Sequence, residues 1–160
     1  MKITYSIIAP IYNEIDNLSE LVRRIKEVMD SSGEPWELIL VDDGSTDGST
    51  DKIRELAQND KIVRPVIFAR NFGHQVAITA GWDYARGDAI IIIDADLQDP
   101  PETILELAKK WKEGFEVVGK PCAIEYKYDG FRLIIHKKGN EIILFTRRLE
   151  NVTKQFPEVI

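Results

Sequence analysis

The sequence contains little sulfur and no long apolar run. Among its 160 residues there is one cysteine, Cys122, and there are two methionines. A single cysteine cannot close a disulfide within the chain, and such rarity is typical of a reducing compartment. No stretch approaches the roughly 20 apolar residues of a membrane helix, and no secretory signal pattern opens the chain. We therefore expect a cytoplasmic protein with no membrane segment.

Positive charge is also scarce over most of the chain. Residues 1–118 carry 13 Lys/Arg against 22 Asp/Glu, whereas residues 119–160 carry 8 against 5. Because nucleic acids are bound through their phosphates by cationic surfaces, the acidic part of the chain argues against a nucleic-acid partner. The change of sign near residue 119 is the first indication that the chain has two parts.

Residues 1–118 alternate between short apolar runs and amphipathic segments. The apolar runs predict strands over residues 3–9, 36–41, 66–69, 89–93 and 115–118. We expect helices between them, the first capped by Asn17 and the fourth beginning at Asp99. Continuous apolar strands between helices are typical of a parallel sheet with helices on both faces, so the predicted fold class is α/β and Rossmann-like. The loops after the strands should then meet at one rim.

The pattern changes after residue 118. Residues 123–128, 131–137 and 141–147 predict three strands without helices between them, an antiparallel β meander. Asp129-Gly130 is a two-residue hairpin signal, and Gly119 is the expected seam between segments 1–118 and 119–160. We expect the meander to extend or cover the parallel half-sheet, which would give one composite domain. Where the cover is incomplete, a homo-oligomer would bury the remaining apolar face.

Two carboxylates follow the fourth predicted strand. Asp94 and Asp96 lie two residues apart, and in extended backbone such residues point to the same side. A pair of this kind suits a hard divalent cation, Mg²⁺ or Mn²⁺, whose shell is completed by substrate phosphates. Gln98 adds a neutral oxygen. The alternative is a loop of solvated acidic residues that holds no ligand.

Four motifs follow the predicted strands in order. They are P-I-Y-N-E at residues 10–14, V-D-D-G-S-T-D at 41–47, R-N-F-G at 70–73 and D-A-D-L-Q-D-P-P-E at 94–102. With this order, residues 3–118 resemble the N-terminal half of a family 2 inverting glycosyltransferase of the dolichyl- or polyprenyl-phosphate sugar synthase type. The resemblance implies a GT-A fold, a nucleotide diphosphate sugar as donor, and Mg²⁺ or Mn²⁺ as cofactor.

The resemblance also implies roles for individual residues. The implied nucleotide pocket is lined by Pro10, Tyr12, Asn13 and Glu14, with Asp42 at the base or ribose and Asp43 beside it. The metal and the diphosphate would be held by Asp94, Asp96 and Gln98, and a phosphate would be reached by Arg70.

Structural roles compete with several of these assignments. Asp42, Gly44 and Ser45 would simply make a turn and cap the following helix. Asn13 would cap the first helix, Tyr12 would lie at the edge of the core, and Arg70 would form a surface ion pair.

A second resemblance lies in the tail. The motif G-K-P-C-A-I-E-Y-K-Y-D-G-F-R at residues 119–132 resembles part of the adenylation domain of archaeal-type ATP-dependent DNA ligases. The resemblance implies that Lys127 is the nucleophile that attacks the nucleotide α-phosphate and that Arg132 helps to hold the nucleotide. Because the later motifs of that family are absent, we expect Lys127 to be inactive. The alternative is an Asp129-Gly130 hairpin flanked by solvated charges.

The two resemblances predict a chimera in which neither active site is complete. Sugar transfer requires both reactants to be held in line, and the acceptor half of the glycosyltransferase is not matched. The main prediction is therefore a folded chimera with at most residual nucleotide-sugar and metal binding. Two alternatives remain open: an active glycosyltransferase fragment that transfers a sugar to a polyprenyl phosphate, and a lysine-adenylating ligase remnant.

Overall fold

The computed structural model describes residues 2–98, 100–114, 116–117, 133–138 and 141–146. The chain divides into two compact units, residues 1–106 and residues 107–160. Each unit is described by itself. Within the described ranges, no helix is both long enough and apolar enough to cross a membrane.

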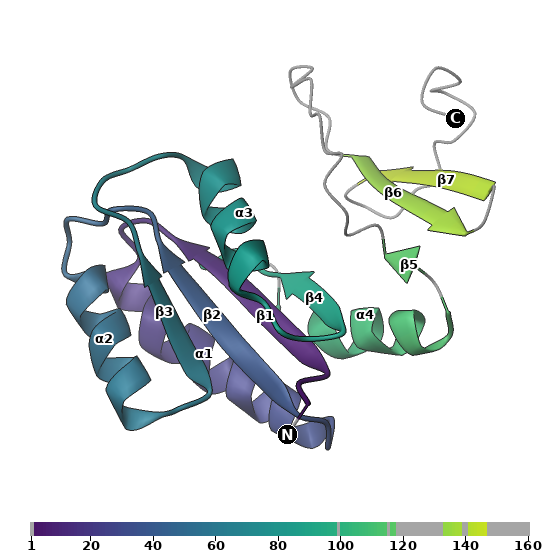
Figure 1. The fold of residues 1–160 in the computed structure, drawn as a ribbon, viewed down its shortest axis with the longest axis horizontal. Coiled ribbons are helices and arrows are strands. Elements are labelled where there is room, and N and C mark those ends of the chain that lie inside the picture. Colours follow the sequence, from purple (N-terminus) through teal and green to yellow (C-terminus); the bar gives the residue numbers. More distant parts are fainter. Residues whose placement is uncertain (1, 99, 115, 118–132, 139–140, 147–160) are drawn as a thin grey trace. The chain divides into compact units, whose positions relative to one another are not determined.

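The first unit is built on a four-stranded parallel sheet (Figure 1). The strands are β1 (Tyr5–Ile11), β2 (Trp36–Asp42), β3 (Val63–Ile67) and β4 (Ala89–Ile92), in the order β3-β2-β1-β4. Every residue of β1 and β2 is buried, because both strands are internal and both faces of the sheet are covered. The predicted parallel α/β sheet is thus confirmed.

Helices cover the two faces of this sheet. α1 (Ile15–Ser31) and α2 (Ser49–Asn59) lie on one face, and α3 (His74–Tyr84) lies on the other (Figure 1). The buried residues of α1 recur three or four apart, at Leu18, Leu21, Val22, Ile25, Val28 and Met29. α3 packs closely because it carries Gly81, where a Cβ atom would lie 2.4 Å from Ile8 Cγ2.

Two helices begin elsewhere than predicted. α1 starts at Ile15, so Asn17 is inside the helix rather than its cap, and its Nδ2 donates to Glu14 Oε2 at 2.7 Å. α4 (Thr103–Lys112) starts later than expected, because a turn precedes it in which Thr103 N donates to the Pro100 carbonyl at 3.0 Å. Asp99, the predicted cap of this helix, lies outside the described residues.

The edge strand β3 tolerates a proline because of its register. Leu38 N donates to the Ile62 carbonyl and Phe68 N donates to the Asp42 carbonyl, so even-numbered residues of this segment face β2. Pro65 is odd-numbered and directs its missing N–H away from the ladder. The proline therefore removes no backbone hydrogen bond between β3 and β2. It also leaves the free edge of β3 with one N–H donor fewer for pairing with a strand of another molecule.

The second unit contains a three-stranded antiparallel sheet in the order β5-β6-β7. Its strands are β5 (Glu116–Val117), β6 (Leu133–Lys138) and β7 (Glu141–Thr146). β5 pairs with β6, so the segment predicted as a fifth strand of the parallel sheet belongs to this sheet instead. The predicted strand 123–128, the seam at Gly119 and the residues Lys127 and Arg132 lie outside the described residues. That this segment covers the parallel sheet, and that the chain forms oligomers, stay predictions.

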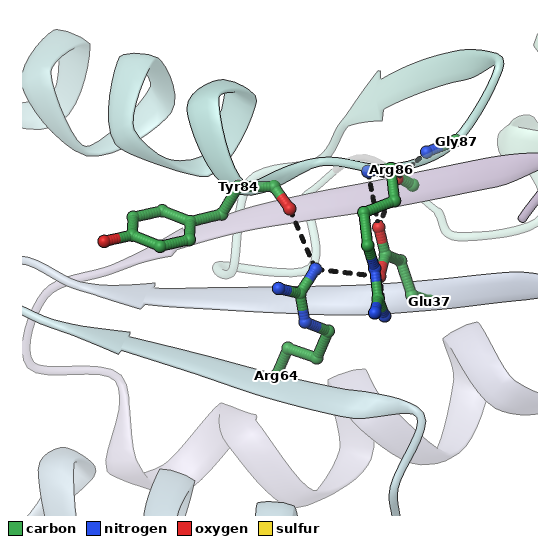
Figure 2. A network of polar contacts seen from close by, with 6 residues as sticks. Glu37, Arg64, Tyr84, Arg86 and Gly87 are labelled. Carbon is green, nitrogen blue, oxygen red and sulfur yellow. Dashed lines mark hydrogen bonds and ion pairs between the residues drawn. The ribbon is translucent and has the colours of Figure 1, made fainter.

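A buried acid ties together the amino-terminal ends of the strands of the first unit (Figure 2). Glu37 of β2 is 1% exposed. Its Oε1 accepts hydrogen bonds from Ser6 Oγ at 2.7 Å and from the Arg86 backbone N–H at 2.8 Å. Its Oε2 accepts from Arg64 Nη1 at 2.9 Å and from Arg86 Nη2 at 2.6 Å. These contacts join β1, β2, β3 and the turn before β4, at the end of the sheet remote from the loops described next.

Candidate functional site at the carboxyl ends of the strands

The strand order sets the position of a binding crevice. From β1 the chain runs outward to β2 and β3, and α3 then carries it back across the sheet to β4 on the other side of β1. The strand order therefore reverses between β1 and β4, and open α/β sheets bind ligands at such a point. Three of the four motifs found in the sequence follow β1, β2 and β4, and R-N-F-G lies between β3 and α3.

A cavity of about 140 Å³ lies at this rim. Its lining comes from three motifs and the start of α3, namely Pro10, Ile11, Tyr12, Asp43, Asn71, Gly73, His74 and Ala77. Tyr12 is 49% exposed, so it is not a core residue and presents its ring to the rim. The cavity suits one ring or one phosphate group rather than a whole nucleotide, since pockets for complete ligands of that size are about 300–1,000 Å³.

Asp43 holds the R-N-F-G loop against the end of β2. This residue is 3% exposed. Its Oδ1 accepts from the Phe72 backbone N–H at 2.7 Å, and its Oδ2 accepts from the Gly73 N–H at 2.9 Å. Such charge-assisted bonds to two successive amides are strong and directional. This anchoring role was not predictable from the sequence, because the two segments are about thirty residues apart.

Asp42 is committed to its own loop. It is fully buried, its Oδ1 accepts from Ser45 N at 3.0 Å, and its Oδ2 accepts from Thr50 Oγ1 in α2. The bond from Ser45 N is the turn that competed with the nucleotide role, whereas the bond from Thr50 comes from a side-chain hydroxyl and does not cap the backbone of α2. Gly44 is required beside it, because its φ is +73° and a Cβ atom there would lie 2.3 Å from the backbone carbon of Arg70.

Asn13 and Glu14 join the loop after β1 to the loop after β2. Asn13 adopts a positive φ of 56°, and its Oδ1 accepts from Thr46 N at 2.8 Å. Its own N–H donates to Ser45 Oγ at 3.0 Å, and Glu14 N donates to Ser49 Oγ at 3.1 Å. Asn13 therefore does not cap α1. These bonds hold the two loops in one arrangement and keep the rim in shape.

Asp47 completes the connection between these loops. Its Oδ2 accepts from Ile15 N at 3.0 Å, and its Oδ1 accepts from Ser49 Oγ at 2.6 Å. Partial burial raises the pKa of Asp47, but the hydrogen bonds from Ser49 and Ile15 lower it by more, so the net direction is downward. Asp47 thus stays ionised and holds the start of α1 at neutral pH.

The acidic loop follows β4. The Asp94 side chain is 32% exposed, and its Oδ1 lies 3.7 Å from His74 Nε2. Asp96 Oδ1 accepts from the Gln98 backbone N–H at 3.0 Å, and the turn between them places Leu97 at a positive φ of 58°. Gln98 is thus tied to Asp96 through its main chain.

The acidic loop is suited to a cation that also binds substrate. In the part of the chain that the structure describes, no three His, Cys, Asp or Glu side chains come together as a complete metal cage. Mg²⁺ and Mn²⁺ do not require one where substrate phosphates supply the remaining oxygens. Asp94 and Asp96 carry carboxylates that such a cation would bind, although residues 95 and 96 form a turn rather than the extended backbone expected from the sequence.

The Arg70 side chain of the R-N-F-G motif stacks on an aromatic ring. The guanidinium of Arg70 lies 4.1 Å from the centroid of the Phe72 ring. Phe72 in turn meets Phe68 edge to face, with ring centroids 5.5 Å apart. Stacking of this kind orients a guanidinium without neutralising it.

Comparison with known proteins gives a consistent result. The family model described as glycosyl transferase family 2 matches residues 6–158. The uncharacterized glycosyltransferase YkcC of Bacillus subtilis (strain 168) is 58% identical over 116 residues, which cover 72% of this chain and 36% of that protein. The uncharacterized glycosyltransferase sll0501 of Synechocystis sp. is 37% identical over 174 residues, covering 99% of this chain and 55% of that protein.

Two further relatives have names that state a substrate or a ligand. The undecaprenyl-phosphate 4-deoxy-4-formamido-L-arabinose transferase of Salmonella paratyphi B is 44% identical over 115 residues, 71% of this chain and 35% of that protein. The solved structure of the mannosyltransferase PcManGT from Pyrobaculum calidifontis, in complex with GDP-Man and Mn²⁺, is 28% identical with a TM-score of 0.57. That match covers 69% of this chain and 32% of that one.

These matches bear on the predicted chimera. The family match and the alignment with the Synechocystis relative both run through the seam predicted at Gly119. They lend no support to a ligase-derived tail, and they favour the alternative prediction of a glycosyltransferase over the main one. The chain spans between about a third and about half the length of the relatives it matches.

Proposed function

The chain belongs to glycosyl transferase family 2, and on that premise we propose that its rim binds the nucleotide diphosphate sugar of a sugar transferase. The acceptor class that we propose is a polyprenyl phosphate. The observation that carries the proposal is the cavity at the switch point, because it unites P-I-Y-N-E, V-D-D and R-N-F-G residues. Asp94 of the fourth motif lies next to one of its lining residues, His74.

The proposed nucleotide contacts come from β1 and its loop. Tyr12 is exposed at the cavity and offers a flat ring on which a base stacks. Pro10 contributes apolar wall, and Asn13 and Glu14 keep the loop in place through backbone bonds to the β2–α2 loop. Asp42 and Asp43 are both buried, but it is Asp43 that borders the cavity, so we assign Asp43 the contact nearest the base or ribose.

The proposed metal ligands are Asp94 and Asp96, with Gln98 close by. When bound, a divalent cation there neutralises charge on the diphosphate that leaves as the sugar is transferred. Arg70, stacked on Phe72, supplies a further positive charge for a phosphate. The part played by the chain's own residues is to hold the donor so that its anomeric carbon faces the acceptor in line.

Calorimetric titration of the full chain tests this function. UDP and GDP are titrated with Mn²⁺ and without it, and at least one is expected to bind more tightly with the metal. Tyr12→Ala should weaken nucleotide binding by about 1–3 kcal/mol, the value of a base stacked on an aromatic ring, while Tyr12→Phe should retain it.

A matched pair of acid variants tests the metal part of the proposal. Asp96→Asn should abolish the effect of Mn²⁺, whereas Asp83→Asn, which alters an exposed acid on α3, should leave it unchanged. Absence of binding by either nucleotide, with and without the metal, would refute the proposed function.

A further inference from the structure

His74 connects the cavity to the acidic loop. It is the first residue of α3, its side chain is 50% exposed, and it lines the cavity together with Tyr12 and Asp43. Its Nε2 atom lies 3.7 Å from Asp94 Oδ1. One imidazole thus borders the proposed nucleotide pocket on one side and a proposed metal ligand on the other.

The backbone that carries His74 is fixed. Gly73, directly before it, donates its N–H to Asp43 Oδ2 at 2.9 Å, which anchors the start of α3 to the end of β2. One turn further on, Ala77 is fully buried against Ile8 and Ile39 of the sheet. A side chain that leaves such a rigid position is held close to one geometry, as ligand-orienting groups require.

The separation of 3.7 Å is longer than a direct hydrogen bond, which ends near about 3.2 Å. Both side chains are partly exposed, 50% for His74 and 32% for Asp94, so a side-chain rotation brings the two atoms within hydrogen-bond distance. Carboxylates that bind metal ions are commonly held by a hydrogen bond from a neighbouring group, and losing that bond costs about 10–100-fold in metal affinity or activity. An imidazole N–H is a suitable donor for this task.

We infer that His74 is a positioning residue, which donates from Nε2 to Asp94 and fixes that carboxylate for a cation shared with the donor diphosphate. The inference rests on the proposed function, since it concerns the same site. It assigns to the R-N-F-G-H segment a task besides lining the nucleotide pocket. It also explains why the first residue of a helix that packs through small residues carries a polar ring directed at the acidic loop.

The test measures Mn²⁺ affinity by electron paramagnetic resonance of free Mn²⁺, with the full chain and saturating UDP or GDP. His74→Phe keeps the ring size and removes the donor, and is expected to weaken Mn²⁺ binding by about 10-fold or more. His74→Gln keeps an N–H donor and should recover most of that loss. In the background of Asp94→Asn, the phenylalanine substitution should add no further loss, because the two side chains act as one unit.

Controls separate this role from a structural one. Gln75→Leu changes the next, exposed residue of α3 and should leave Mn²⁺ affinity unchanged. Far-UV circular dichroism shows whether a variant is folded, so it identifies a loss of Mn²⁺ affinity that is caused by misfolding. A positioning role requires that His74→Phe and a second variant, His74→Ala, both weaken Mn²⁺ binding while they are folded.

Three results would overturn the inference. If folded His74→Phe binds Mn²⁺ as tightly as the wild type, the positioning role is excluded and the proposed function stands. The same holds if the losses in Mn²⁺ affinity from His74→Phe and Asp94→Asn multiply in the double variant. Failure of the wild-type chain to bind Mn²⁺ with either nucleotide would overturn both.

Discussion

Replacing Glu37 with glutamine is expected to destabilise the first unit strongly, because five hydrogen bonds converge on this buried carboxylate. Glutamine has the same size but only one acceptor oxygen, so donors from Arg64 or Arg86 lose their partner. Removing one member of a buried ion pair costs about 3–5 kcal/mol. The Arg86 side chain is 58% exposed and can be rehydrated, which places the expected loss near the lower end, at about 3 kcal/mol.

The effect of Glu37→Gln should depend on pH. Burial raises the pKa of Glu37, but hydrogen bonds from Arg86, Ser6 and Arg64 lower it by more, so it lies below its ordinary value of 4.5. A carboxyl whose pKa is lower in the folded state stabilises that state above its unfolded pKa and loses this contribution as pH falls. The stability difference between wild type and variant should therefore be full at pH 7 and shrink below about pH 4.5.

Urea unfolding followed by far-UV circular dichroism measures this difference. A loss of about 3 kcal/mol corresponds to a fall in Tm of about 6–12 °C for a chain of this size. Glu20→Gln is the matched control, since it removes a solvent-exposed i,i+3 partner of Arg23 and should leave the midpoint unchanged. The reasoning would be refuted if Glu37→Gln had the same urea midpoint as the wild type at pH 7. It would also be refuted if the difference in free energy of unfolding between wild type and variant stayed constant down to pH 3.

Two further substitutions probe the rim. Gly44→Ala should destabilise the chain by about 1–3 kcal/mol or more, because a Cβ atom there adds overlap with the Arg70 backbone to the strain of a positive φ. Gly33→Ala is the control and should cost less, because Gly33 also has a positive φ but lies in open space. Equal urea midpoints of the two variants would contradict this. Asp43→Asn leaves one oxygen to accept from the two backbone amides of Phe72 and Gly73. One of these amides should therefore exchange with deuterium about 10-fold faster, which corresponds to about 1–2 kcal/mol. Unchanged exchange at both amides would show that the carboxylate does not hold the loop.

The parallel sheet and its rim were predictable because they depend on local pattern. Runs such as Leu38–Val41 are apolar throughout, which is typical of a strand covered on both faces. Once the strands are parallel, the residues that follow them must meet at one end, so Tyr12 and Asp94 could be placed at one rim without coordinates.

The anchoring roles of Asp43 and Glu37 were not predictable in the same way. Each depends on partners far away in the chain, about thirty residues for Asp43 and up to 49 residues for Glu37. A buried glutamate within an apolar strand is a sign that a cation lies nearby, but spacing alone does not select Arg64 and Arg86 among the available cations. The start of α1 was misplaced for a similar reason, because the N–H groups of Glu14 and Ile15 are bound by Ser49 at the start of α2 and by Asp47 of the preceding loop rather than by a local cap.

The seam prediction shows the limit of reading short motifs. The resemblance of the segment around Lys127 to a ligase motif finds no support in the comparisons, because a motif of a few residues carries weight only in its structural context. The family match that continues to residue 158 argues for one ancestry across Gly119.

The most direct test of the whole account locates the ligand on the molecule. Mn²⁺ is added with UDP or GDP to the ¹⁵N-labelled full chain, and paramagnetic broadening of each amide signal is measured. Broadening is predicted around residues 12–14, 43–46, 71–74 and 94–98, and not around Glu37 or Arg86 at the opposite end of the sheet. Broadening centred on Glu37 and Arg86, or no localised broadening at all, would contradict a donor site at the carboxyl ends of the strands.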